Sequence, residues 1–303
     1  MPQLFVLDRS PRSVLALTGG DREAFLQGMV SNDVVAIPEG ETRHAALLDA
    51  TGHILADLHV WTLPDTLFVE TDPACLDTLS STLTKFLIME DVQIADWSAQ
   101  YSVLSVYGEG AAEITLLDVN AAVVSTSLPL LPGVDLWVLA EEKEEAWAKL
   151  LALGAIELTA EDAEALRIEA GIPKWGAELS PSVLLPETEM LDAVSYTKGC
   201  YVGQEIVARL HARGHTNKAL RRILLAEDAP VPPVGATLHV PEDGPEPGRE
   251  IGSVTSAAES PPRGGRAVAL GYVRKEYFEP GTPISVQIAQ PNGLMFSYAA
   301  EVL

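Results

Sequence analysis

The chain has 303 residues, of which 47% are hydrophobic and 21% are charged, and its formal net charge is −23. This composition is typical of a globular protein with two or three structural units, not of a disordered chain. So negative a chain argues against general binding to nucleic acid or to anionic membranes, since both require a positive surface.

The sequence also argues against other classes of protein. It contains no run of about 18 apolar residues that would predict a membrane span. Its first residues hold no apolar core of signal-peptide length, so a cytoplasmic protein is expected. Two cysteines, Cys75 and Cys200, are too few for a disulfide framework or a self-contained metal site.

The first hundred residues mix strand-like and helical patterns. Asp21 is a candidate cap for a helix that carries Phe25 and Leu26. Asp72-Pro73 predicts the start of a second helix, whose apolar face holds Leu76, Leu79, Leu83 and Phe86-Leu87. Strands are expected at 13–17, 44–49, 53–63, 67–71, 92–97 and 101–107.

The pattern recurs in the middle of the chain and then changes. A strand at 134–140 precedes helices at 141–153 and 159–170, which favours an α+β fold. After about residue 220 the helical periodicity disappears, and short strands alternate with loops rich in proline and glycine. This is typical of a small β-barrel or sandwich, with strands at 222–226, 236–240, 251–256, 266–273, 283–289 and 295–303.

The segment Lys198-Gly199-Cys200-Tyr201-Val202-Gly203-Gln204-Glu205 is the main candidate for chemistry. It opens a basic window, 198–222, that holds six of the 20 Lys and Arg residues and one acid, a local balance of about +5 that predicts an anionic ligand. Cys200 precedes a stretch with helix-forming character. A helix N-terminus and Lys198 would both favour its reactive thiolate form. The alternative is a small buried cysteine in a tight turn.

Other polar residues allow two readings each. Glu205 and Arg209 have the spacing of an ion pair along a helix, and they could instead orient a ligand. Arg167 and Glu169 point in different directions on one helix, so one of them is expected to face inward. Asp57 lies in an apolar strand, where it either serves catalysis or faces solvent on the polar side.

Two further patterns give weaker signals. His211 and His215 have a spacing that can bind metal on a helix, but Gly214 interrupts the helix and no third ligand is near, so no metal site is predicted. The tryptophans are expected in the core, although one such as Trp175 could stack on a flat ligand. The sequence contains no P-loop, dinucleotide fingerprint, GxSxG elbow or zinc motif.

These segments together resemble a known family. The stretch 198–209 resembles the K-G-C-[FY]-x-G-Q-E-x-x-A-R signature of the YgfZ family, folate-binding proteins that support iron–sulfur proteins within the glycine-cleavage T-protein (aminomethyltransferase) superfamily. The segments 25–34, 51–57, 167–173, 251–256 and 269–274 are similar to other family elements in the same order. The resemblance covers most of the chain, and the cysteine-centred signature is its specific part.

The resemblance implies a fold and a ligand. The expected fold class is α+β, a T-protein-like arrangement of ferredoxin-like α+β units plus a C-terminal β-barrel around a central folate channel. The expected domains are a folate-binding region at 1–220, with sub-units at 1–97 and 98–220, and a barrel at 221–303. The expected cofactor is tetrahydrofolate or a derivative, whose glutamate tail would be the anion held by the basic window.

Departures from the T-proteins bear on function. T-proteins carry an Asp-Asp pair where this chain has Ala56-Asp57, and they lack the cysteine of the signature. Both differences favour a YgfZ-like protein, and Asp57 is retained as a candidate for folate chemistry. The acidic pterin contact of the T-proteins has no clear counterpart here, and its candidates are Glu169, Glu178 and Glu187.

The sequence therefore leaves three hypotheses. The first is a tetrahydrofolate-binding accessory protein for iron–sulfur cluster assembly or repair, which would act with an iron–sulfur carrier or client protein. The second is a folate-dependent aminomethyltransferase that uses Asp57, and the third is a folate-binding module without chemistry at Cys200. The catalytic candidates are Cys200, Lys198 and Asp57, and the cofactor-binding candidates are Arg167, Glu169, Trp175, Glu187, Tyr201, Gln204, Glu205 and Arg209.

Overall fold

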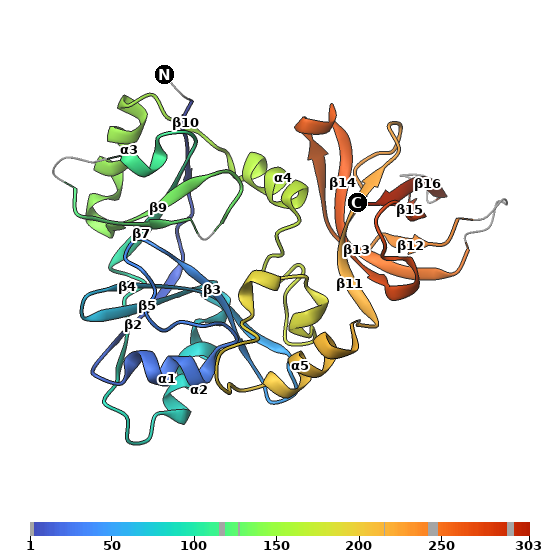
Figure 1. Cartoon of the computed structure of the whole chain (residues 1–303). Helices are drawn as coiled ribbons and strands as arrows, with labels where there is room; N and C mark the ends of the chain where they lie inside the picture. The colour runs from blue at the N-terminus through green and yellow to red at the C-terminus, as the bar shows by residue number, and fades with distance from the viewer. Residues whose placement is uncertain (1–2, 115–118, 127, 215, 242–247, 290–293) are drawn as a thin grey trace. The chain divides into compact units, whose positions relative to one another are not determined.

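The computed structural model describes residues 3–114, 119–126, 128–214, 216–241, 248–289 and 294–303 (Figure 1). The chain forms two compact units. The first comprises Met1–Ala160 and Met190–Ile206, and the second comprises Glu161–Glu189 and Val207–Leu303. The chain thus leaves the first unit at residue 161 and returns to it for 17 residues that include most of the cysteine signature.

One five-stranded antiparallel sheet of the first unit has the order β3-β4-β5-β2-β6. Asp72 begins the helical segment that follows β5, because its side chain accepts a hydrogen bond from the backbone N–H of Ala74. The elements are β2 (Ser13–Thr18), α1 (Arg22–Met29), β3 (Arg43–Leu48), β4 (Ile54–Leu63), β5 (Thr66–Thr71), the short 3-10 helix η1 (Pro73–Cys75), α2 (Leu76–Phe86) and β6 (Gln93–Asp96).

The other five-stranded sheet of this unit has the order β10-β1-β7-β9-β8. Its strand β1 comes from the start of the chain and pairs with β7, a hundred residues later. The elements are β1 (Phe5–Asp8), β7 (Tyr101–Tyr107), β8 (Ala121–Ser125), β9 (Gly133–Leu139), α3 (Lys143–Ala152) and β10 (Ile156–Glu157). Helix α3 covers one face of this sheet through Ala146 and Leu150.

A shared core joins the two sheets. Trp61 of β4 stacks on Phe68 of β5 with ring centroids 4.0 Å apart, and it contacts Trp137 of β9. Burial of such large side chains contributes roughly 2–3 kcal/mol each. Arg9 adds a buried ionic link, because its guanidinium lies 2.8 Å from Glu70 of β5 and 2.9 Å from Asp135 of β9.

The second unit contains a closed six-stranded barrel, coloured orange to red in Figure 1, and the yellow-green helix α4 packs on its outer face. Alternate residues of β11 point in opposite directions. Ile223 and Leu225 fill the barrel, whereas Leu220 and Leu224 pack against Ile168 of α4. The elements are α4 (Ala160–Ala170), β11 (Lys218–Leu225), β12 (Thr237–His239), β13 (Glu250–Ser260), β14 (Arg266–Arg274), β15 (Pro283–Ala289) and β16 (Met295–Val302).

The predicted α+β fold with a C-terminal barrel is confirmed. No sequence pattern indicated β1, β8 or β10, and Asp21 forms no side-chain cap on α1, because its carboxylate accepts from the backbone N–H of Asp91 instead. None of the helices within the described ranges is long and apolar enough to cross a membrane. The expected domain boundaries after residues 97 and 220 remain predictions.

Candidate functional site

Lys198 anchors the cysteine signature to the end of helix α1. Its ammonium group donates to the backbone oxygens of Gln27, Val30 and Asn32 at 2.6, 2.7 and 2.7 Å. Carbonyls at a helix C-terminus lack partners within the helix, so a cation is favourable there. Burial lowers the pKa of Lys198 to about 8, while the charge of Asp33 opposes that shift. All three ammonium protons of Lys198 are therefore used in hydrogen bonds that attach the signature to the end of α1.

Cys200 is exposed, and the other cysteine, Cys75, is buried. The alternative of a small buried cysteine at position 200 is therefore wrong. Helix α5 (Gln204–Arg213) begins four residues after Cys200, beyond the single turn over which a helix dipole acts strongly. Neither this dipole nor the fully engaged ammonium of Lys198 explains an activated thiol. Its reactivity stays a prediction that rests on exposure.

Gly203 marks where the signature packs against the β3–β4 hairpin. Its φ is +84°, and a Cβ added there would lie 2.6 Å from the backbone oxygen of Asp49 and 2.9 Å from Cβ of Leu48. In the hairpin turn, Gly52 has a φ of +83°, and its Cβ would meet Ile206 at 3.0 Å. Glycine is needed at both positions because each adopts a left-handed conformation in close contact with the opposing segment.

A histidine flanked by two carboxylates lies beside this hairpin. His44 of β3 places Nε2 2.7 Å from Asp57 Oδ1 on β4 and Nδ1 2.8 Å from Asp192 Oδ2. Asp192 belongs to the short 3-10 helix η5 (Leu191–Ala193). Burial alone would lower the pKa of His44, but the two carboxylates raise it to about 10. Burial would raise the pKa of Asp57, but His44 lowers it to about 2.

A second imidazole completes this cluster. The ring of His59 stacks on that of His44, with centroids 4.6 Å apart and planes inclined by 2°. Burial and the positive charge of His44 lower the pKa of His59 to about 4, so His59 is neutral at pH 7. Its Nδ1 atom is buried and has no hydrogen-bond partner among the described residues.

The end of α1 also fixes the segment that carries Asp192. The side-chain amide of Asn32 donates to the backbone oxygens of His44 and Asp192, both at 2.7 Å. The hydroxyl of Ser31 donates to the backbone oxygen of Ala193 and accepts from the N–H of Ala46. Sequence reasoning aligned this stretch with a family motif but gave it no role.

In the second unit, Arg167 lies in a buried polar network. Only 4% of the residue is exposed. Its guanidinium lies 3.0 Å from Glu178, 2.9 Å from the hydroxyl of Ser256 on β13 and 2.7 Å from Glu164. Glu178 also accepts from Ser256 at 2.6 Å and from the backbone N–H of Lys174 at 3.0 Å. Both residues thus join α4 to the barrel.

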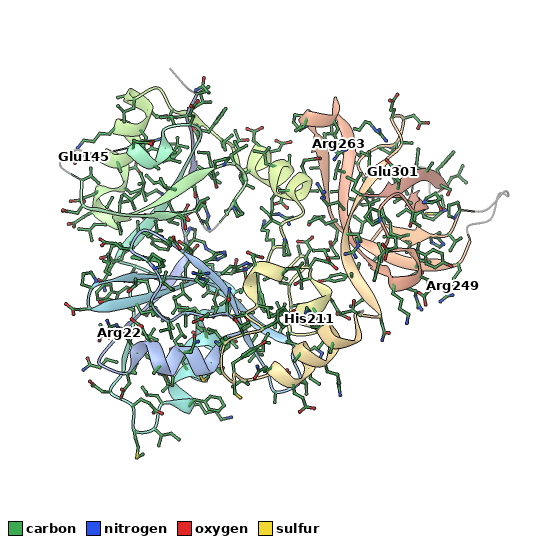
Figure 2. The ribbon with its side chains drawn as sticks, viewed as in Figure 1. Arg22, Glu145, His211, Arg249, Arg263 and Glu301 are labelled. Atoms are coloured by element: carbon green, nitrogen blue, oxygen red, sulfur yellow. The ribbon has the colours of Figure 1, made fainter. Side chains whose placement is uncertain are left out.

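Glu169 ties the same helix to the barrel. It accepts from the hydroxyl of Ser260 at 2.7 Å and from Nε of Arg263 at 2.8 Å, and Arg263 is labelled in Figure 2. The expectation that one residue of the 167/169 pair faces inward is confirmed, since Arg167 is buried and Glu169 is half-buried. With their charges engaged inside the protein, both residues support the fold.

Glu187 is less fully engaged. It ends the short 3-10 helix η4 (Leu185–Glu187), and its carboxylate lies 3.7 Å from the ammonium of Lys218. That ammonium also sits 4.7 Å above the ring of Tyr272. Of the three acidic candidates, Glu187 has the weakest protein partner. Trp175 is half-buried in the same unit.

The remaining candidates lie on the signature and on α5. Tyr201 is buried, and the ammonium of Lys198 lies 5.2 Å from its ring centroid. Gln204 is half-buried, while Glu205 and Arg209 are exposed. Of the two readings of this pair, the ion pair along the helix is not formed among the described residues, and the ligand-orienting role stays a prediction. His211 is exposed on α5 (Figure 2), and His215 lies outside the described residues.

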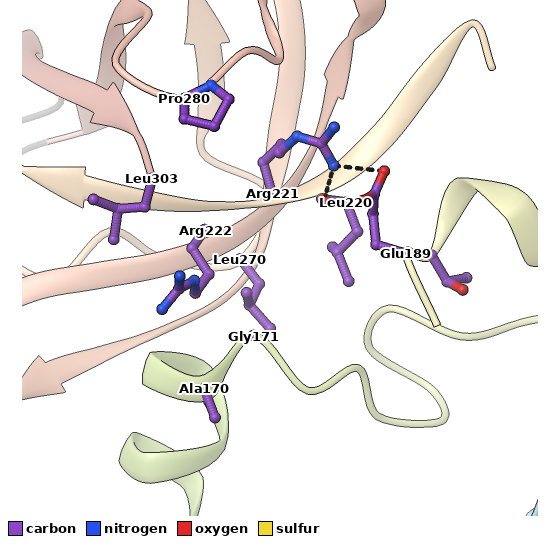
Figure 3. A pocket seen from close by; sticks show the side chains of 10 residues that line it. Ala170, Gly171, Glu189, Leu220, Arg221, Arg222, Leu270, Pro280 and Leu303 are labelled. Atoms are coloured by element: carbon purple, nitrogen blue, oxygen red, sulfur yellow. Dashed lines mark hydrogen bonds and ion pairs between the residues drawn. The ribbon is translucent and has the colours of Figure 1, made fainter. Parts of the chain in front are cut away.

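A pocket of about 370 Å³ opens in the second unit (Figure 3). Arg221 and Glu189 form an ion pair at 2.8 Å beside it, and Arg222 donates to the backbone oxygen of Glu169 at 2.8 Å. Three cations of the basic window, Lys218, Arg221 and Arg222, thus have partners within the protein. The pocket is lined by Ala170, Gly171, Thr188, Glu189, Leu220, Arg221, Arg222, Leu270, Pro280 and Leu303.

Comparison with known proteins identifies the family. Residues 3–132 match the GCVT N-terminal domain, and residues 218–302 match the glycine cleavage T-protein C-terminal barrel domain. The two domains together cover more than two thirds of the chain. This chain belongs to the glycine-cleavage T-protein superfamily.

Relatives within the superfamily carry several names. A tRNA-modifying protein YgfZ from Yersinia enterocolitica is 29% identical over 69% of this chain and 67% of its own length. An aminomethyltransferase from Streptomyces avermitilis is 27% identical over 91% and 80%, and a putative chloroplastic transferase from Arabidopsis thaliana is 25% identical over 93% and 68%. The resemblance to YgfZ is thus supported beside a resemblance to the transferases.

A solved member of the superfamily shares the fold. The aminomethyltransferase T of Bartonella henselae superposes with a TM-score of 0.83 over 99% of this chain and 85% of its own, at 19% identity. The histidine–carboxylate cluster draws His44, Asp57 and His59 from the matched N-terminal domain, whereas Cys200 and Asp192 lie between the two matched segments. The matched segments therefore include the first group of residues but not Cys200 or Asp192.

Proposed function

We propose that this protein is a tetrahydrofolate-binding accessory protein that supports the assembly or repair of iron–sulfur clusters, with Cys200 as its working thiol. The observation that carries the proposal is an exposed cysteine on a segment fixed at both ends. Lys198 anchors that segment to α1, and Gly203 packs it against the β3–β4 hairpin. A fold that fixes the flanks of an exposed thiol is consistent with a function for that thiol.

A cluster would reach this protein as cargo. One cysteine cannot hold an iron–sulfur cluster, which takes about four protein ligands. Within the described ranges, no group of three or more His, Cys, Asp or Glu side chains could hold a metal ion. A partner, such as an iron–sulfur carrier or client protein, would supply the other ligands while Cys200 contacts the cluster or its sulfur.

The proposal also accommodates the name of one relative. The Yersinia protein is called tRNA-modifying. With a net charge of −23, this chain is poorly suited to hold a polyanion such as tRNA. We propose that any effect on tRNA passes through a client enzyme that depends on an iron–sulfur cluster.

Folate binding is proposed for the first unit. Asp57 of β4 offers a partly exposed carboxylate, and Gln204 offers a half-buried amide that can both donate and accept hydrogen bonds. The cofactor-binding candidate Tyr201 is a poor stacking platform for a flat ligand, because it is buried beside the ammonium of Lys198.

The test of this function is genetic complementation. In a strain that lacks its own copy, we expect the wild-type chain to restore the activity of iron–sulfur enzymes and Cys200→Ser to fail. Cys75→Ala is the matched control, because it removes the other, buried thiol and should still complement. If Cys200→Ser restores activity as well as the wild type does, the proposed role of the thiol is wrong.

A folate-dependent aminomethyltransferase is the second candidate, favoured by the partly exposed Asp57 and by the name of the Streptomyces relative. Against it, His44 holds the pKa of Asp57 at about 2, so this carboxylate is a weak base at neutral pH. Turnover of an aminomethylated lipoyl carrier with tetrahydrofolate would establish this candidate, and background rates with a competent carrier would refute it.

A further inference from the structure

The ring of His44 is held on three sides. Asp57 faces Nε2, Asp192 faces Nδ1, and the ring of His59 covers one face. Distances of 2.7 and 2.8 Å are those of charge-assisted hydrogen bonds. A ring with both nitrogens and one face engaged cannot rotate without losing several contacts. It therefore fixes the carboxylate of Asp57 in one orientation.

The geometry also fixes the charges. An ionised carboxylate only accepts hydrogen bonds, so an imidazole between two of them carries a proton on each nitrogen. His44 is then a cation. Its neighbours are Asp57 and His59, which lie on β4, and Asp192, which lies on η5. Charges further out, Arg12, Arg9 and Glu70, also act on Asp57 or His59. The raised pKa of His44 and the lowered pKa of Asp57 agree with this charge state.

Half of the Asp57 carboxylate remains available. Oδ1 faces His44, whereas Oδ2 makes no hydrogen bond or ion pair with the described residues. The Asp57 side chain is 19% exposed, so a ligand can reach it. An ionised oxygen held in one direction fits a ligand that presents an N–H donor, such as the amide or amino edge of a heterocycle.

We propose that His44 is a positioning residue that keeps Asp57 ionised and aims its free oxygen at an N–H group of the bound ligand. The ligand class rests on the proposed function, in which the N–H donor belongs to tetrahydrofolate. Asp192 completes the arrangement from a segment 148 residues away in sequence from His44. Asp57 then acts as a fixed acceptor and not as a general base.

The first experiment tests the charge state without any ligand. In the full-length chain with labelled histidines, NMR should show His44 protonated on both nitrogens at pH 7.5, with its signals assigned from the His44→Gln spectrum. Asp57→Asn should lower the pH at which His44 titrates by at least one unit. A His44 ring with a single proton at pH 7.5 would overturn the proposal.

The second experiment tests the role in binding, with tetrahydrofolate as the probe and oxygen excluded. Wild-type affinity should be flat between pH 5.5 and 7, below the pKa of Lys198. In His44→Gln, the new carboxamide can still donate to Asp57 but carries no charge. The affinity of this variant should fall at low pH, by about tenfold for each unit by which the pKa of Asp57 exceeds the assay pH. His53→Gln, on the same hairpin but outside the cluster, should behave as the wild type does.

The outcomes separate the two claims. If the wild type binds and His44→Gln matches it at every pH, the positioning role is wrong and folate binding stands. If the wild type does not bind tetrahydrofolate, the proposed function and the ligand assigned to Asp57 both fail, while the NMR titration still decides the charge state of His44.

Discussion

Gly203→Ala is the sharpest test of how the cysteine signature is built. Gly203 has a φ of +84°, and an alanine Cβ there would lie 2.6 Å from the backbone oxygen of Asp49. The left-handed conformation costs alanine about 1–2 kcal/mol. Relieving the overlap requires movement of backbone and of Leu48 Cβ, which costs roughly 1–3 kcal/mol more. We therefore expect the variant to lose about 2–5 kcal/mol of unfolding free energy.

Gly199→Ala is the matched control in the same motif. Gly199 has no positive φ, and its added Cβ would meet no atom within 4 Å. We expect its unfolding free energy to change by less than about 0.5 kcal/mol, or to rise slightly as the unfolded chain loses freedom. If folate binds close to the backbone of Gly199, the added methyl group of Gly199→Ala should weaken folate binding without loss of stability.

Urea unfolding followed by tryptophan fluorescence is the assay. Four of the five tryptophans, Trp61, Trp97, Trp137 and Trp147, lie in the first unit, so the signal reports the unit that contains Gly203. A Gly203→Ala variant as stable as Gly199→Ala would refute the close packing of signature and hairpin. If both variants lost a similarly large unfolding free energy, the difference between Gly203 and Gly199 seen in the structure would be wrong.

Three further predictions concern charge and burial. Glu178→Gln should lower the unfolding free energy by about 3 kcal/mol or more, because it leaves the buried Arg167 with one charged partner fewer. Glu189→Gln changes a carboxylate that is 46% exposed and should cost about 0–1 kcal/mol. Equal effects of the two variants in thermal unfolding would contradict this prediction. The pKa of His44 rises from 6.5 to about 10 on folding, so its contribution to stability is complete below pH 6.5 and declines as pH rises toward 10. Wild-type unfolding free energy should therefore fall more steeply than that of His44→Gln between pH 7 and 10, and parallel curves would refute the pairing. Burial raises the pKa of Cys75 to about 12, so mass spectrometry after alkylation at pH 8 should find one adduct, on Cys200, and modification of Cys75 in the folded chain would contradict its burial.

The sequence predicted the barrel well, because each of its strands has a pattern of its own. The expected strands at 251–256, 266–273 and 283–289 overlap β13, β14 and β15. Helix α2 was equally readable from Leu79 and Leu83, which share one face and are buried. Strand β1 was missed because four residues between loops carry little periodicity, and its partner lies a hundred residues away.

The histidine–carboxylate cluster could not be predicted, although Asp57 was singled out. In β3 and β4, Leu48 pairs with Ile54 next to the hairpin turn. If the pairing continued regularly from there, His44 would lie opposite Leu58. The register shifts by one residue at Leu47/Leu48, which sets His44 opposite His59 instead. A one-residue shift reverses which side chains share a face. Asp192 arrives from a distant segment that no local pattern links to the hairpin.

Lys198 shows the other limit of sequence reasoning. Its place two residues before Cys200 predicted an electrostatic effect on the thiol, but its ammonium group is used by three carbonyls at the end of α1. Adjacency in sequence did not indicate the direction of a long side chain. The exposure of Cys200 likewise became known only from the fold.

The most direct test of the proposed function is the alkylation rate of Cys200 in the native chain, with and without tetrahydrofolate. No substitution is needed to silence Cys75, because its thiol is buried and protonated at the assay pH. We expect Cys200 to react readily because it is exposed, and we expect tetrahydrofolate bound at the nearby Gln204 to slow the reaction. A Cys200 that reacts at the same rate at saturating tetrahydrofolate would contradict the proposal that folate binds at Gln204, four residues from the thiol.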